Sequence, residues 1–589
     1  MENLQIPNHL STVAKSQRSV VVGPQREFFS GEAGGKWAGT HFFHSLLEEN
    51  KGRLAEKFNG RVKFACPATS VLRSGCFEDF LQENRLYNFF ETERNDAEIL
   101  SRFLAADFNS AQKQAFLEIL DAQRQPLIVR SSALGEDAER ASFAGSYYSV
   151  FISNIGTKGQ RLEQLEAAIK LVYASAFLEN AREFARRNNV LIGAQKMAIM
   201  VQDVVGSQWQ AREGGQYFSP QASFAAYSFN DFAPIGVDPN HGFMRVALGL
   251  GPGVLDGHER MALRVNLGKP YPITGLYNIS DYDRYSPTHF FALGLDGGIP
   301  DSENGLLRRL SFAIAPEGMM ENYVSYYSAD NDIMRDTDLM GAMEPLVSFK
   351  NIVNRRLPFV DAVRELKQIL EDAFGMLVDF EGAFDTVGTG ATSIIHCLQA
   401  RAQVRRKDGR LDNLPDVSAE MQILNANNSI GKGKYEISTV IYVPHSEFSH
   451  ASASVLSNEI LMINREMVAQ RKQYALFVPG RFGTQDKSTG IPGTFATISN
   501  ASAIVEQVDG QNNLPSQGTH LFEDIVGAGI AYLHHNGNRQ FNPALLERYA
   551  SSIRSVGSIL IYEFEQPLKL VLDKGGNCLL FAGSEAWSN

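Results

Sequence analysis

Residues 129–151 read VRSSALGEDAERASFAGSYYSVF. The apolar runs on either side predict two strands, and a polar loop that contains glycine lies between them. Arg130 stands at the end of the first predicted strand and is followed by Ser131, Ser132 and Gly135. Arginine pairs well with phosphate oxygens, and backbone N–H groups in such turns also bind anions. The stretch therefore predicts an anion site beside a sheet.

Three further stretches carry related chemistry. GGK places Lys36 at the start of a predicted helix, whose N-terminus also favours an anion. In VDFEG, Asp379 and Glu381 alternate on a strand and share one face, as Gln399 and Arg401 of LQAR do on the next strand. Taken singly, each stretch better suits an ordinary structural role: a turn with a solvated lysine at GGK, a strand end with a helix cap at VRSS, and surface carboxylates at VDFEG. Together they offer the cations and carboxylates that a nucleoside triphosphate with Mg²⁺ requires.

Size and composition restrict the class of protein. A chain of 589 residues is too long for one core, so two to four domains are expected. The net charge of −11 without a basic face argues against nucleic acid, and no apolar run is long enough for a membrane. Four scattered cysteines and no apparent secretory signal predict a cytoplasmic protein with reduced thiols. Homo-oligomerisation is left open.

The pattern of helices and strands predicts an α/β fold with α+β character. We expect a flexible N-terminus at 1–20, a first domain at 21–410 and a C-terminal α/β domain at 411–589. The boundary is placed in the charged segment RRKDGRLDNLPD. In the C-terminal domain, strands are expected at STVIYVP, YALFVPG, ATIS and ASAIVEQ, with a helix at LSNEILMINREMVAQRK.

Five stretches in this order resemble the nucleotide-binding domain of pyruvate phosphate dikinase and phosphoenolpyruvate synthase, over about residues 25–405. They are GGK, VRSSALGEDAERASFAGSYYSVF, MAIMVQDVV, ALGLGPGVLDG and VDFEGAF…IIHCLQAR. The resemblance implies an ATP-grasp-like, two-lobed domain that binds ATP and Mg²⁺. It also implies that the protein is an ATP-dependent phosphotransferase.

The resemblance implies roles for individual residues. Contact with the phosphates, the phosphate loop or the adenine is expected of Lys36, Arg130, Ser131, Ser132, Gly135 and Gln202. Mg²⁺ is expected to be held by Asp379, Glu381 and Gln399. Arg401 is expected to face the transferring phosphate.

The C-terminal part departs from the dikinases. Their phosphorylatable histidine lies in a motif with a glycine pair, whereas EFSHASASVL around His450 has none and suits an ordinary helix start. No stretch resembles a phosphoenolpyruvate-binding barrel. This part is instead similar to stand-alone bacterial proteins labelled phosphoenolpyruvate synthase-like. Arg481 in PGRFGTQD suits either a substrate site or a tight turn, and His520 in PSQGTH suits either a catalytic base or a helix cap.

The leading hypothesis is phosphoryl transfer from Mg-ATP to a small-molecule acceptor bound between the ATP cleft and the Arg481/His520 region. Two alternatives stay open. One is a ligase of the ATP-grasp type that works through an acyl phosphate. The other is a nucleotide-binding regulatory protein with little turnover.

Overall fold

The structure is a computed structural model that describes residues 19–583 with internal gaps. The gaps are 88, 90–92, 134–136, 139–140, 143–146, 190–195, 212–213, 234–236, 256–259, 269–281, 283–285, 329–332, 338–342, 354–355, 388–391, 404–408, 508–514, 518 and 536–539. The N-terminus that we predict to be flexible therefore lies almost wholly outside the described residues, and so does Gly135.

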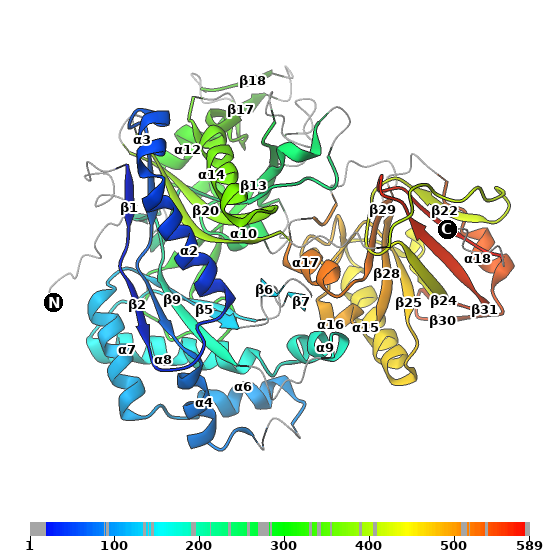
Figure 1. Ribbon diagram of the computed structural model, residues 1–589, viewed down its shortest axis with the longest axis horizontal. Coiled ribbons are helices and arrows are strands. Elements are labelled where there is room, and N and C mark those ends of the chain that lie inside the picture. Colours follow the sequence, from blue (N-terminus) through cyan, green and yellow to red (C-terminus); the bar gives the residue numbers. More distant parts are fainter. Residues whose placement is uncertain are drawn as a thin grey trace.

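A five-stranded sheet forms the first layer. Its order is β2 (Gln25–Phe28), β4 (Thr69–Leu72), β9 (Met197–Asp203), β5 (Leu127–Ala133) and β8 (Ser149–Ile152). Beside it lie five helices, α4 (Ser74–Glu83), α6 (Asp96–Leu104), α7 (Ser110–Ala122), α8 (Lys158–Ser175) and α9 (Glu179–Arg187) (Figure 1). Capping boxes at Asn109 and Thr157 begin α7 and α8, because each side chain accepts a hydrogen bond from a backbone N–H of the first turn.

A seven-stranded sheet forms the second layer. Its order is β1 (Val20–Val22), β3 (Val62–Cys66), β21 (Thr392–Ala402), β20 (Val378–Val387), β12 (Ala222–Tyr227), β13 (Phe243–Leu248) and β14 (Ala262–Asn266). The helices α2 (Gly35–Glu49), α3 (Lys51–Phe58) and α14 (Phe359–Phe374) pack beside it, and their apolar residues share one core with its strands (Figure 1). The central β20–β21 hairpin is the longest pairing of this layer, so it holds its side chains firmly.

Smaller elements complete this half of the molecule. One sheet contains β10 (Ser207–Gln210), β11 (Gln216–Ser219), β15 (His289–Gly294) and β16 (Leu307–Ser311). Another contains β18 (Ile333–Arg335), β17 (Val324–Ser328) and β19 (Glu344–Val347). A two-stranded ribbon pairs β6 (Asp137–Ala138) with β7 (Ala141–Ser142). The short helices are α10 (Pro252–Leu255), α12 (Glu317–Tyr323) and α13 (Lys350–Val353).

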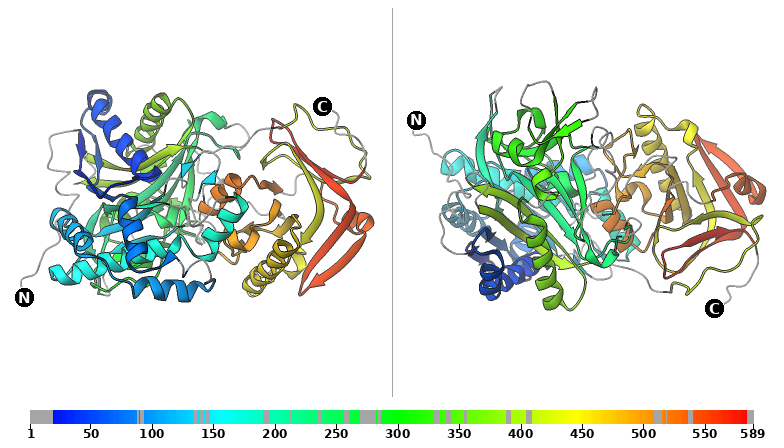
Figure 2. Two further views of the ribbon diagram at one scale, coloured as in Figure 1. Left: turned by 60° about the horizontal axis from the view of Figure 1, so that its bottom comes forward. Right: turned by 90° about the horizontal axis from the view of Figure 1, so that it is seen from above.

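A nine-stranded sheet carries the C-terminal part of the chain. Its strands are β22 (Gln422–Ala426), β32 (Cys578–Phe581), β31 (Ile559–Leu572), β24 (Lys434–Tyr442), β25 (Tyr474–Pro479), β28 (Ala501–Gln507), β29 (Ala531–His535) and β23 (Ser429–Ile430), with β30 (Ser552–Val556) paired to β31. Its helices are α15 (Ala453–Gln470), α16 (Phe495–Ile498), α17 (His520–Gly527) and α18 (Ala544–Tyr549), and a ribbon pairs β26 (Arg481–Phe482) with β27 (Gly490–Ile491). We call this sheet and these helices the C-terminal unit. It lies at one end of the molecule in both views of Figure 2.

Alternate residues of β25 fill two different cores. Tyr474, Leu476 and Val478 belong to a core that continues into the five-stranded sheet, whereas Ala475 and Phe477 belong to a core on the other face. Successive side chains of a strand point to opposite faces, so one strand supplies both. The C-terminal unit therefore shares apolar packing with the N-terminal half rather than hanging from a linker.

The predicted α/β class with α+β character is confirmed, since helices and mixed sheets make up the molecule. One predicted strand is wrong: the segment ATIS lies in α16, begun by a capping box at Thr494. Among the described residues, no helix is both long and apolar enough to cross a membrane.

Candidate functional site

A cavity of about 440 Å³ lies where the two large sheets of the N-terminal half meet the C-terminal unit. The wall is formed by segments far apart in the chain, from α2, β5 and β9 to β20, α16 and α17. It includes five residues that the sequence singles out, namely Lys36, Arg130, Gln202, Glu381 and His520.

Lys36 is placed by the turn before α2. Gly34 has a φ of 78°, and a Cβ there would lie 1.7 Å from the carbonyl oxygen of Ser132, so only glycine fits. Lys36 follows in the first turn of α2, with only 4% of its surface exposed. Its Nζ donates a hydrogen bond to Ser131 Oγ at 3.3 Å. The close approach of Gly34 to the backbone of Ser132 thus fixes the ammonium group of Lys36 at the cavity wall.

The serine pair lies in a different place from the one we predict. The sequence places Ser131 and Ser132 in a loop after the strand, but β5 continues to Ala133 because it stays paired with β9. Both serines are fully buried, and neither lines the cavity. Ser132 Oγ instead accepts a hydrogen bond from the N–H of Trp37 at 3.0 Å. The two hydroxyl groups therefore accept hydrogen bonds from Lys36 and Trp37 and stabilise the first turn of α2.

Arg130 and Glu381 face each other across the two large sheets. Arg130 Nη2 lies 3.4 Å from Glu381 Oε2, and the side chains are 9% and 20% exposed. Burial raises the pKa of the Glu381 carboxyl, but the positive charges around it, first Arg130 and then Arg401 and Lys36, outweigh burial and lower the pKa. Glu381 is therefore ionised, in surroundings dominated by positive charge.

The predicted common face of β20 and β21 is confirmed by the register of the hairpin. Asp379 pairs with Arg401, and Glu381 pairs with Gln399. A β-bulge follows Glu381, and the extra residue, Leu398, lines the cavity. Four of the predicted residues thus form two cross-strand pairs beside one another.

Arg401 does not line the cavity. Its Nε lies 2.8 Å from Asp379 Oδ1, and its Nη2 contacts the carboxylate of Glu523 on α17. Burial raises the pKa of Asp379 to about 7, opposed by Arg401. The arginine that we predict to face the transferring phosphate is thus held between two carboxylates, one from each half of the molecule.

His520 enters the cavity from the C-terminal unit. It is the first residue of α17, after Thr519, whose Oγ1 accepts a hydrogen bond from the N–H of Phe522 at 3.3 Å. Burial lowers the pKa of His520 to about 3, Arg401, Lys36 and Arg130 act in the same direction, and Glu381 opposes them. The imidazole is therefore neutral at ordinary pH and able to accept a proton. The capping role belongs to Thr519 rather than to His520.

Part of the cavity lining is apolar. Phe151, Val204 and Leu250 belong to one hydrophobic cluster with Ile128 packed against it, and Leu255 adds a further apolar side chain. Leu250 and Leu255 come from the stretch ALGLGPGVLDG, which the sequence analysis singles out without assigning a role to its residues.

Polar groups of β9 border this apolar part of the lining. Gln202 is 2% exposed and donates to Thr69 Oγ1 at 3.2 Å. Burial raises the pKa of neighbouring Asp203 to about 7, although its hydrogen bond from Gln123 lowers it. An apolar slot with polar groups at its edge is suited to a flat heteroaromatic ring.

Gln399 carries an oxygen that suits a cation. The side chain is 2% exposed, and its Oε1 is buried without a hydrogen-bond donor among the residues that the structure describes. Glu381 stands opposite it in the hairpin. Carboxylate and amide oxygens are ligands that Mg²⁺ accepts, usually together with water and phosphate oxygens. Within the described part of the chain, no cluster of three or more His, Cys, Asp or Glu could hold a metal by itself.

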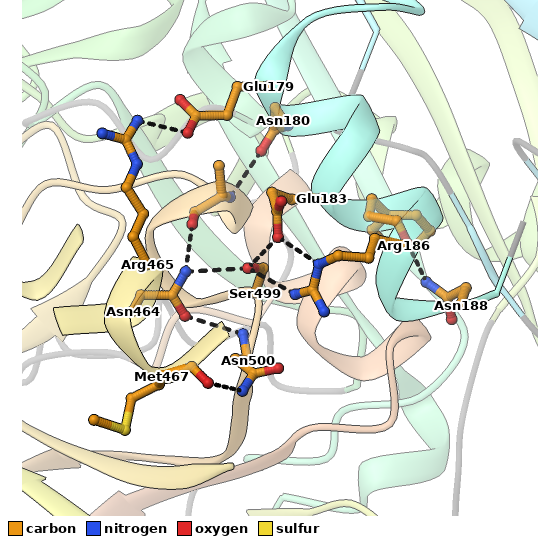
Figure 3. Close-up of polar contacts among 12 residues, drawn as sticks. Glu179, Asn180, Glu183, Arg186, Asn188, Asn464, Arg465, Met467, Ser499 and Asn500 are labelled. Carbon is orange, nitrogen blue, oxygen red and sulfur yellow. Dashed lines mark hydrogen bonds and ion pairs between the residues drawn. The ribbon is translucent and has the colours of Figure 1, made fainter. Parts of the chain in front are cut away.

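The helix α9 joins the C-terminal unit to the cavity wall (Figure 3). Ser499 Oγ donates to Glu183 Oε2 at 2.7 Å, and Arg465 forms an ion pair with Glu179 at 2.6 Å. Asn180 Oδ1 accepts from the N–H of Ala496 at 3.1 Å. Glu179, Asn180 and Ala496 also line the cavity, so the junction and the site share residues.

Comparison with known proteins identifies part of the chain. Residues 32–263 match the family described as pyruvate phosphate dikinase, AMP/ATP-binding domain. This part of the chain is similar to the AMP/ATP-binding domain of pyruvate phosphate dikinase. A protein of Bacillus subtilis (strain 168) named uncharacterized phosphotransferase YvkC is 26% identical over 193 residues. The alignment covers 33% of this chain and 20% of that relative, so the chain spans about a fifth of its length.

The matched AMP/ATP-binding domain contains only part of the cavity wall. Lys36, Arg130 and Gln202 lie within residues 32–263, whereas Glu381 and His520 lie beyond them. The resemblance seen in the sequence is thereby confirmed. The cavity adds to the AMP/ATP-binding domain a strand hairpin and a C-terminal helix.

The other C-terminal candidates lie apart from the cavity lining. Arg481 Nε donates to Ser516 Oγ at 3.5 Å, and His450 is exposed in a turn before α15. From the loop that follows Arg481, Gln485 lines the cavity.

Sequence reasoning missed Gln485, Asp203 and Glu523. The only signal for Glu523 was its position one helical turn after His520.

Proposed function

We propose that the protein is an ATP-dependent phosphotransferase that moves phosphate from Mg-ATP to a small-molecule acceptor. The observation that carries this proposal is one cavity that unites cationic groups of the AMP/ATP-binding domain with a carboxylate and a neutral imidazole from outside it. These are Lys36, Arg130, Glu381 and His520. The relative named as a phosphotransferase supports the same class of reaction.

The cationic wall would bind the phosphates. Lys36 supplies a compact ammonium group, and Arg130 supplies a planar guanidinium group that can donate two parallel hydrogen bonds. Both line the cavity, and both groups suit the oxygens of a triphosphate. The apolar slot around Ile128, Val204 and Leu250 would take the adenine, with Gln202 at its edge. The two large sheets would then be the lobes of an ATP-grasp-like domain.

Glu381 and Gln399 would hold Mg²⁺, because they present an ionised carboxylate and a buried amide oxygen at opposite positions of the hairpin. When bound, the ion would neutralise charge on the phosphates. Asp379 would contribute through Arg401, to which it is paired, rather than as a direct ligand.

His520 would act as the general base for the acceptor. The neutral ring can take the proton of a hydroxyl or amine as that group attacks phosphorus. Bound phosphates would raise the pKa of His520 from its low value, because they add negative charge beside it. The acceptor would lie on the His520 side of the cavity, near Gln485 and Thr494 of the C-terminal unit.

The test is phosphorus NMR of the purified protein with Mg-ATP, with and without a small-metabolite extract. We expect ADP and a new phosphorylated product that depend on both the extract and His520. AMP with phosphate would indicate dikinase chemistry instead. ADP formed only when a carboxylic acid and an amine are both present would indicate a ligase. Bound but unchanged ATP under every condition would contradict phosphoryl transfer and favour a regulatory role.

A further inference from the structure

Glu523 lies outside the cavity lining and close to two residues of the site, Arg401 and His520. It lies on α17 with 13% of its side chain exposed, and its Oε2 contacts Arg401 Nη2. The same oxygen lies 4.0 Å from Nδ1 of His520, one turn earlier on the helix. Glu523 does not line the cavity, so it would act through these two neighbours rather than on a ligand.

Two carboxylates hold Arg401. Asp379 pairs with it from the same hairpin, with 2.8 Å between Arg401 Nε and Asp379 Oδ1, and Glu523 pairs with it from α17. Glu523 belongs to the C-terminal unit, whereas Arg401 and Asp379 belong to the β20–β21 hairpin. The ion pair therefore ties α17 to the strands that carry Glu381 and Gln399.

Positively charged side chains surround His520. Lys36 on α2, Arg130 on β5 and Arg401 on β21 all disfavour its protonation, and Glu381 on β20 opposes them. Nδ1 of the ring is buried on the side of Glu523, while 27% of the His520 side chain remains exposed. A carboxylate beside Nδ1 stabilises an imidazolium that forms when Nε2 takes a proton.

From this arrangement we propose that Glu523 is a positioning residue, which orients His520 and Arg401 for transfer and stabilises the protonated His520. This inference rests on the proposed phosphotransferase function. In the step, the O–H or N–H bond of the acceptor breaks and its proton moves to Nε2 of His520. The acceptor atom bonds to phosphorus, and the bond from phosphorus to the leaving nucleotide oxygen breaks. Glu523 takes no part in the bonds that form and break.

The test compares Glu523→Gln, which removes the charge at constant size, with Glu523→Asp, which keeps it. Glu466→Gln is the matched control, because Glu466 forms a partly exposed ion pair with Arg554 in the same unit and does not line the cavity. The pKa of His520 is followed by NMR of histidine-labelled protein with a non-hydrolysable Mg-ATP analogue, and the signal is assigned with His520→Asn. Turnover is measured with Mg-ATP and the metabolite extract.

We expect Glu523→Gln to lower the pKa of His520 by about one unit, since a charge near 4 Å is removed. We also expect kcat to fall about 10- to 100-fold with a smaller change in KM for ATP. Glu523→Asp should recover part of both effects. An unchanged pKa of His520 in Glu523→Gln would overturn the proposal even if turnover fell, because a purely structural anchor would give that result.

The NMR readout needs no turnover, so it separates the two proposals. If the wild-type protein transfers no phosphate, the proposed function fails. The shift in the pKa of His520 still decides whether Glu523 controls the histidine.

Discussion

Replacing Glu381 with glutamine tests the electrostatics of the cavity most directly. Glu381 is the carboxylate that balances Lys36 and Arg130, and it is ionised although it is largely buried. In Glu381→Gln the shape is kept, but Arg130 loses its ion-pair partner. The cavity then carries more net positive charge, which should favour binding of metal-free ATP. The proposed Mg²⁺ site loses its charged ligand.

The size of the effect follows from the geometry. Two unit charges 3.4 Å apart interact by about 5 kcal/mol at an effective dielectric constant of about 20. The two side chains are only 9% and 20% exposed, so the cost of removing both charges from water offsets most of this attraction. We therefore expect metal-free ATP to bind with about 1–2 kcal/mol more favourable free energy, or roughly 10-fold more tightly. Turnover should fall about 100-fold or more, since charge neutralisation on the phosphates is lost.

The assay is calorimetric titration with ATP in EDTA and again with Mg²⁺, followed by phosphorus NMR for turnover. Wild-type protein should bind ATP better with Mg²⁺ than without it, and Glu381→Gln should show little difference. Glu466→Gln again controls for loss of one negative charge elsewhere on the molecule. If Glu381→Gln binds metal-free ATP no more tightly than wild type, Glu381 does not set the charge of the phosphate site.

Four further substitutions test the phosphate site, the pH dependence of stability and the shared core. Lys36→Ala and Arg130→Ala should each lower turnover about 100-fold or more with unchanged circular dichroism, and wild-type activity in both would contradict the phosphate site. Asp203 has a pKa raised from 3.8 to about 7, so its contribution to stability is lost as pH rises through 7. Asp203→Asn should therefore raise the unfolding free energy at pH 8 more than at pH 5, and equal effects in urea titrations at both pH values would disprove this. Phe184 is fully buried, with its ring 5.0 Å from Phe495. Phe184→Ala should cost about 3–5 kcal/mol in urea unfolding and weaken ATP binding, and wild-type stability would refute the shared core.

In the C-terminal unit, sequence patterns predict the long apolar strands correctly but fail for a short segment. The strands YALFVPG and ASAIVEQ could be read from apolar runs of strand length, and both are strands of the nine-stranded sheet. ATIS has the same local character, yet it forms α16, because Thr494 caps it and Phe495 packs against Phe184 of α9. A four-residue segment carries too little local preference to resist such a contact.

Local rules were enough for the features that depend on neighbours in the chain. The strand period of two put Asp379 with Glu381, and Gln399 with Arg401, on one face. The glycine in GGK was needed for a turn with positive φ before α2, which set Lys36 in the first turn. The order of five motifs was enough to suggest the family of the AMP/ATP-binding domain, and residues 32–263 match it.

Only the tertiary structure decided which of these groups meet and which are already paired. Strand β5 runs through Ser131 and Ser132 because β9, about 70 residues further on, continues to bond with it. Arg401 is engaged by Glu523, 122 residues away, and His520 reaches the cavity because α9 and α17 seat the C-terminal unit against the N-terminal half. Contacts between such distant segments depend on how whole sheets pack, and no periodicity within one segment records that.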